Sequence, residues 1–126
     1  MNAAVEAAPS LQLACLCAAW CRLCDAYAPV IEQVAAELAA EGLLLSTRWI
    51  DIEDEAELVG DYDVETFPTL LLLDERQLRF AGPVTPQPET LRRLLRALAA
   101  GAGQPAAGVP VAAEGLAQRL REQRLA

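Results

Sequence analysis

The sequence contains no histidine and no lysine, so all ten of its basic residues are arginine. Without histidine, the chain cannot build a Ser-His or Cys-His nucleophile pair, a histidine general base or a Cys/His zinc site. Without lysine, it cannot build a P-loop lysine site or a Schiff-base enzyme. The chemistry that remains points to sulfur, because the chain has four cysteines.

Positive charge and long apolar segments are scarce as well. The 126 residues include 18 acidic against 10 basic side chains, a net charge of −8, which argues against a nucleic-acid partner because phosphate binding needs clustered positive charge. No apolar run approaches the roughly 20 residues of a membrane span, and residues 1–10 lack the basic flank and apolar stretch of a secretory signal. We therefore expect a cytoplasmic protein that binds neither nucleic acid nor membranes.

Hydrophobic periodicity predicts strands and helices that alternate around a mixed sheet. An apolar stripe from Leu23 to Leu38 recurs every three to four residues, as on one face of a helix. The expected strands are 11–18, 43–52, 69–73 and 77–81, and the expected helices are 21–42, 53–60 and 88–98. The domain organisation that we expect is an extension at 1–10, one domain at 11–100, a flexible linker at 101–110, and a tail at 111–126. The tail either forms a short amphipathic helix that docks on the domain or frays.

The four cysteines lie within ten residues, at positions 15, 17, 21 and 24. Cys21 and Cys24 form a C-x-x-C at the junction of a predicted strand and a predicted helix, a spacing that allows a disulfide within the first helical turn. Unpaired N–H groups and the partial positive charge of that turn favour a thiolate at Cys21, and Arg22 can add to this effect. The pattern indicates a redox-active dithiol, with a purely structural pair as the alternative.

Three motifs together resemble the thioredoxin family over about residues 11–100. They are the sequence Trp-Cys-Arg-Leu-Cys at 20–24, Ala-Pro at 28–29 and Tyr-Asp-Val-Glu-Thr-Phe-Pro-Thr at 62–69. The resemblance implies an α/β, thioredoxin-like fold, with a mixed central sheet of about four strands flanked by helices. Because only about ten residues precede the first predicted strand, we expect the family's N-terminal strand-helix unit to be shortened or missing.

The resemblance also assigns roles to individual residues. It implies that Cys21 is an exposed nucleophile and Cys24 a buried resolving thiol. Pro68 matches the family's cis-proline, which lies opposite the disulfide, and Gly82 matches a glycine that borders the substrate groove. The candidate substrate-binding residues are therefore Trp20, Arg22, Phe67, Pro68 and Gly82. For Trp20 and Phe67, ordinary core packing is the competing interpretation.

Two positions depart from the family in a way that bears on chemistry. The family's buried Asp, six residues before the nucleophile, aligns with Cys15, and its Lys partner aligns with Trp49. Because that carboxylate assists proton transfer at the resolving cysteine, its loss is expected to slow the steps that deprotonate Cys24. Arg-Leu also replaces the Gly-Pro that thioredoxin itself has between its two cysteines.

Cys15 and Cys17 are two residues apart on a predicted strand, so their side chains share one face. Three interpretations stay open at this point. Both residues can be small buried hydrophobes, as free cysteines usually are, or Cys17 can act as an auxiliary resolving thiol for Cys21 or Cys24. A four-thiolate zinc site is the third, but strand-borne cysteines fit tetrahedral geometry poorly. We therefore expect no metal.

Eight carboxylates without a single basic residue lie between positions 51 and 65. They predict either a solvated face or a docking surface for a basic partner.

The function that we expect is thiol–disulfide exchange through Cys21 and Cys24. Such an enzyme needs no cofactor, and its partners would be protein disulfide or dithiol substrates and a thiol reductant. We expect a monomer. The alternative is a non-catalytic adaptor of the same fold, which would hold a partner through the groove beside Pro68 and the acidic face.

Overall fold

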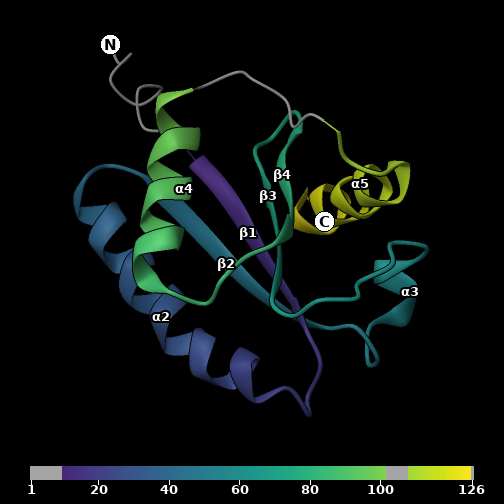
Figure 1. Ribbon diagram of the computed structural model, residues 1–126. Coiled ribbons are helices and arrows are strands. Elements are labelled where there is room, and N and C mark those ends of the chain that lie inside the picture. Colours follow the sequence, from purple (N-terminus) through teal and green to yellow (C-terminus); the bar gives the residue numbers. More distant parts are fainter. Residues whose placement is uncertain (1–9, 102–107, 126) are drawn as a thin grey trace.

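A four-stranded mixed sheet forms the centre of the computed structural model, which describes residues 10–101 and 108–125 (Figure 1). The strand order is β2-β1-β3-β4. The strands are β1 (Ser10–Cys17), β2 (Leu44–Asp51), β3 (Thr69–Leu73) and β4 (Leu78–Pro83). β1 pairs with β2 in parallel and with β3 antiparallel, and β4 pairs antiparallel with β3. This arrangement confirms the predicted fold class.

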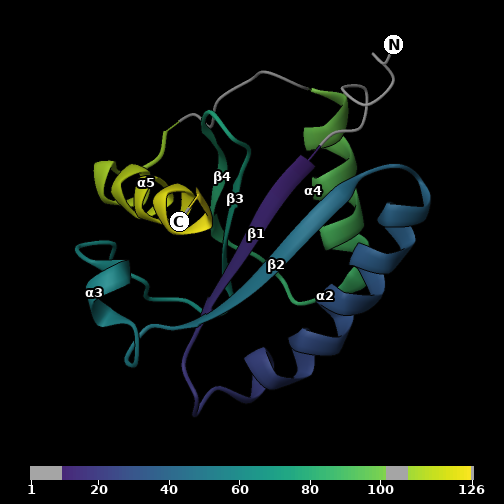
Figure 2. The same ribbon diagram turned by 180° about the vertical axis from the view of Figure 1, so that it is seen from behind.

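Helices cover both faces of the sheet (Figures 1 and 2). One face carries α2 (Arg22–Ala40) and α4 (Pro88–Ala100), and the other carries α3 (Ala56–Val59) and α5 (Val111–Leu125). Each helix and strand overlaps a segment predicted from the sequence. Within the described residues, no helix is both long and apolar enough to cross a membrane.

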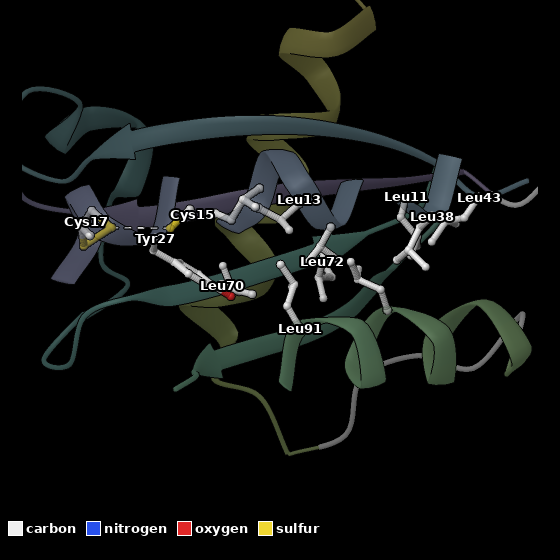
Figure 3. Close-up of a cluster of buried hydrophobic side chains, with 14 of the residues drawn as sticks. Leu11, Leu13, Cys15, Cys17, Tyr27, Leu38, Leu43, Leu70, Leu72 and Leu91 are labelled. Carbon is white, nitrogen blue, oxygen red and sulfur yellow. Dashed lines mark hydrogen bonds between the residues drawn. A yellow bond between two sulfur atoms is a disulfide. The ribbon is translucent and has the colours of Figure 1, made fainter. Parts of the chain in front are cut away.

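The two middle strands, β1 and β3, are mostly apolar and almost wholly buried because both of their faces are covered; their polar residues are Ser10, Gln12 and Thr69. Successive side chains of β1 point to opposite faces, and this alternation divides them between two cores. Leu13, Cys15 and Cys17 pack with α2 and α4 in one buried cluster, which Figure 3 shows. Ala14 and Leu16 pack on the other side with α5. The strand therefore delivers two cysteines to the same face, under the start of α2.

The buried stripe of α2 begins one residue later than predicted. Cys24, Tyr27, Ile31, Val34 and Leu38 are its buried residues. Leu23, expected at the start of the stripe, is 56% exposed, because in the first turn it is Cys24 that faces the sheet. The correction matters for the site, since it leaves an apolar side chain at the surface between the two cysteines of the C-x-x-C motif.

Two arginines of α4 tie that helix to α2. The Arg92 guanidinium donates to Glu37 at 2.6 and 3.1 Å, and Arg96 donates to Glu41 at 2.7 and 3.2 Å. The hydrogen bonds from Arg92 lower the pKa of the Glu37 carboxyl, and those from Arg96 lower that of Glu41. Exposed pairs of this kind add little stability, but they fix the register of the two helices that cover the cysteine face.

The tail forms a docked helix, so the fraying alternative is wrong for the described part of α5. Ala113, Leu116, Ala117 and Leu120 are fully buried against the second core. The Arg119 guanidinium donates to the carbonyl oxygens of Leu58 at 2.7 Å and Val59 at 3.1 Å. These bonds satisfy carbonyls at the end of α3 that lack helical partners. Residues 102–107 of the expected linker lie outside the described residues.

Candidate active site

Cys21 occupies the N-cap position of α2, directly after the loop that follows β1. Its backbone is extended (φ −87°, ψ 111°), its N–H donates to the Ala18 carbonyl at 3.0 Å, and its carbonyl accepts from the Asp25 N–H at 3.3 Å. The first helical N–H groups beyond it lack partners within the helix. Cys21 was expected to be exposed, yet it is only 8% exposed, because it packs in the same apolar cluster as Cys24.

Cys24 lies in the first turn of α2, and it is bonded to Cys17 in a disulfide. Their Cα atoms are 6.0 Å apart, within the usual range of about 4.4–6.8 Å. The expected pair was Cys21 with Cys24, and the structure instead leaves Cys15 and Cys21 as free thiols. The reason is geometric: Cys24 points from the helix onto the sheet face that carries Cys17, whereas Cys21 precedes the first turn.

Cys17 is therefore the residue whose role the sequence left open. Of the three interpretations, burial as an inert hydrophobe is wrong for Cys17, because its sulfur is bonded to Cys24. The signal that pointed to it was its place on the same strand face as Cys15.

In the part of the chain that the structure describes, no group of three or more His, Cys, Asp or Glu side chains could hold a metal ion.

Cys15 is a buried thiol beside that disulfide. It is fully buried, and its Sγ lies 3.5 Å from Cys17 Sγ, the contact marked in Figure 3. Burial raises the pKa of the Cys15 thiol to about 12, and negative charge on Cys21 adds to the shift. Because the thiolate is the nucleophile in exchange, Cys15 stays protonated and inert near neutral pH.

The positions of the family's buried charge pair carry no charge in this chain. Cys15 and Trp49 are register partners across β1 and β2, so the two positions adjoin each other. They line a cavity of about 200 Å³ together with Leu13, Ala28, Ile31, Glu32, Thr47 and Arg48. No carboxylate replaces the aspartate on β1 at this position.

An aromatic pair stands at the surface next to the C-x-x-C motif. The rings of Trp20 and Phe67 lie 5.5 Å apart, edge to face at 76°. Trp20 is 68% exposed, so core packing is wrong for it, whereas Phe67 is half-buried and packs partly against the cysteine cluster. Arg22 and Leu23 are also exposed. The apolar surface at this end of α2 is therefore open to solvent.

The remaining predicted site residues are Pro68, directly before β3, and Gly82, near the end of β4, the strand that pairs with β3. The Phe67–Pro68 peptide bond is cis, and Pro68 is buried. Its carbonyl accepts from the Val84 N–H at 3.1 Å. Gly82 pairs with Leu70 in the adjoining part of the β3–β4 ladder. The Phe67–Pro68 segment is thus joined both to the exposed aromatic surface and to the end of β4.

The comparisons with known proteins agree with this geometry. A family model described as Thioredoxin matches residues 1–97. The thioredoxin of Bacillus subtilis is 34% identical over 73 residues, which make up 58% of this chain and 67% of that protein. The protein disulfide-isomerase of Gallus gallus is 40% identical over 53 residues, 42% of this chain. The chain spans only about a tenth of the length of the protein disulfide-isomerases that it matches.

Solved structures show the same fold at low identity. The germline-specific thioredoxin protein Deadhead from Drosophila melanogaster superposes with a TM-score of 0.60 at 19% identity, covering 75% of this chain and 87% of that one. A mutant thioredoxin from Halobacterium salinarum gives 0.56 at 24% identity, covering 75% and 79%. The relatives and the Cys17–Cys24 disulfide together support a thioredoxin-like redox role. On its sequence match and its fold, the chain belongs to the thioredoxin family.

Proposed function

We propose that this protein exchanges disulfides with protein or small-thiol substrates, and that Cys21 is its attacking sulfur. The observation that carries the proposal is the position of Cys21 at the N-cap of α2. The residue is 8% exposed, while the three other cysteines have no exposure at all. Only Cys21 therefore combines access from solvent with the N–H groups of a helix start.

The reaction follows from the order of the two cysteines of the motif. The Cys21 thiolate attacks one sulfur of a substrate disulfide, forms a mixed disulfide and releases the other substrate sulfur as a thiolate. Cys24 then attacks Cys21 Sγ, which releases the second substrate thiol and leaves the protein oxidised by two electrons. A thiol reductant returns the protein to the reduced state, and no cofactor takes part.

The exposed surface around the motif supports binding of an unfolded or loop substrate. Trp20 and Leu23 offer apolar area, and Arg22 adds a positive charge. Phe67 extends this surface toward Pro68 and Gly82, where we place the groove for substrate backbone. We propose a monomer that acts in the cytoplasm, where reducing conditions keep thiols available, and that binds neither nucleic acid nor membranes.

Trapping of the mixed disulfide tests this function. The double variant Cys17→Ala/Cys24→Ala removes both sulfurs of the buried disulfide and leaves Cys21 without its resolving thiol. With a symmetric peptide disulfide, it is expected to accumulate one peptide adduct per chain, on Cys21, measured by intact-mass and peptide-mapping spectrometry.

The matched control is Cys17→Ala/Cys21→Ala, which also retains two thiols, Cys15 and Cys24. We expect no adduct on it, because both remaining sulfurs are fully buried. Equal adduct on both variants, or none on either, would contradict Cys21 as the attacking sulfur.

A further inference from the structure

Cys24 shares an apolar cluster with two other cysteines, Cys17 at the end of β1 and Cys21 at the N-cap of α2. The function proposed above pairs it with Cys21, three residues earlier in the chain. In the structure it is bonded to Cys17 on β1. Both potential partners belong to one apolar cluster with Cys24, between β1 and the start of α2.

We propose that Cys17 is a third redox cysteine, which displaces Cys21 from its disulfide with Cys24 after a substrate has been reduced. The inference rests on the proposed function, because it assumes that Cys21–Cys24 is the disulfide formed first. The oxidised protein then rests with a buried Cys17–Cys24 disulfide and a free Cys21 thiol, as the structure shows them.

The internal step is a balanced thiol–disulfide exchange. Cys17 loses its proton, and its thiolate attacks Cys24 Sγ; the Cys21–Cys24 bond breaks as the Cys17–Cys24 bond forms. Cys21 leaves as a thiolate and regains a proton from solvent. One disulfide and one thiol enter the step and one of each leaves it, so no oxidant or reductant is required.

Burial affects both the equilibrium and the rate of this exchange. A disulfide carries no charge, so its transfer to two fully buried residues leaves the ionisable sulfur at Cys21, the one cysteine with solvent access. Deprotonation of Cys17 inside the apolar cluster costs free energy, so the attack by Cys17 is expected to be slow. The Cys21–Cys24 disulfide, whose formation releases the substrate, is therefore expected to form first. Cys15, whose Sγ lies 3.5 Å from Cys17 Sγ, remains a free thiol in the structure, so the disulfide rests at Cys17.

The consequence is that the oxidised protein keeps a free thiol that can react with substrate. With Cys24 held by Cys17, Cys21 can still attack a second substrate disulfide and form a mixed disulfide. No resolving thiol is then available next to Cys21, so the substrate's own thiol must reverse the bond. The oxidised protein would therefore rearrange substrate disulfides without net reduction.

Disulfide mapping tests the exchange without any need for turnover. The reduced protein is oxidised with diamide, free thiols are blocked with iodoacetamide at successive times, and the chain is cut with trypsin and chymotrypsin. Cleavage after Trp20 and Arg22 separates Cys17, Cys21 and Cys24 into three peptides. We expect an early product that joins Cys24 to the Cys21 peptide and a final product that joins Cys24 to the peptide ending at Trp20. Because that peptide holds both Cys15 and Cys17, its fragmentation must place the disulfide on Cys17 and the label on Cys15. A final product that holds Cys21–Cys24, with the label on Cys17, would overturn the proposal.

Two single variants sharpen the result. In Cys17→Ala, the Cys21–Cys24 disulfide must persist, and labelling of Cys21 in the oxidised protein must fall to background. Cys15→Ala, a neighbouring buried position on the same strand face, must keep the wild-type pattern. If Cys17→Ala left Cys21 labelled as in the wild type, the proposal would fail. If the trapping experiment failed but the disulfide map showed the expected early and final products, the result would contradict the proposed function alone.

Discussion

Replacement of Cys21 by serine is expected to reduce disulfide-reducing turnover to the rate of the thiol donor alone. A serine hydroxyl neither ionises near neutral pH nor forms a disulfide, so the first covalent step cannot take place. The measurement is the reduction of a protein disulfide with dithiothreitol as donor, at equal concentrations of wild type and variant. The effect is an all-or-none loss, because none of the remaining sulfurs has solvent access.

The control for this substitution is Cys15→Ala. Cys15 lies in the same cluster, but burial raises its pKa to about 12, so its removal is expected to leave most of the turnover intact. Turnover that survives in Cys21→Ser would contradict the assignment. Absence of turnover in the wild type itself, with several donors, would favour the alternative of a binding module that uses the groove beside Pro68.

Replacement of Leu116 by alanine is expected to lower the free energy of unfolding by about 2–5 kcal/mol. Leu116 is fully buried between α5 and the sheet face that contains Ile50 and Leu71, so the truncation leaves a cavity. The loss is large against the total of about 5–15 kcal/mol that is usual for folded proteins. Urea unfolding followed by circular dichroism measures it.

Val111→Ala on the same helix is the matched control. Val111 is 87% exposed, so its truncation should change the free energy of unfolding by no more than about 0.5 kcal/mol. If the two variants were equally stable, α5 would not be docked in solution. Such a result would restore the frayed tail as the correct description of residues beyond the linker.

The strands and their succession along the chain were accessible from sequence, because the apolar pattern follows directly from burial; the order of the strands within the sheet was not. β3 is fully buried along its length, and a short apolar run is the pattern typical of a covered central strand. The C-x-x-C motif and residues 62–69 supplied the family. Both features depend on local sequence, which a single chain records without reference to its tertiary contacts.

The disulfide partner of Cys24 could not be predicted from sequence spacing, because it depends on where α2 packs on the sheet. Cys17 and Cys24 meet because the start of α2 lies over the odd-numbered face of β1, with their Cα atoms 6.0 Å apart. Spacing within the motif made Cys21 the nearer partner along the chain. The fact that Cys15 and Cys17 share a strand face was visible in the sequence, but the side chain that would face them was not.

The docking of α5 was open for a similar reason. A helix of α3's length, four residues, covers little of its sheet face, and the apolar side chains there need another cover. The small side chains Ala113 and Ala117 allow α5 to approach closely. The composition of this segment alone is equally compatible with a terminus that frays. Whether it docks depends on the sheet face that α3 leaves uncovered, which the sequence does not show.

The most direct test of the central claim is to label the fully reduced native protein with a limiting amount of iodoacetamide and to identify the modified cysteine by mass spectrometry. If Cys21 is the attacking sulfur, it must carry nearly all of the label, because it alone has solvent access at the helix start. Label found first on Cys15, Cys17 or Cys24, or spread evenly over the four, would contradict the account.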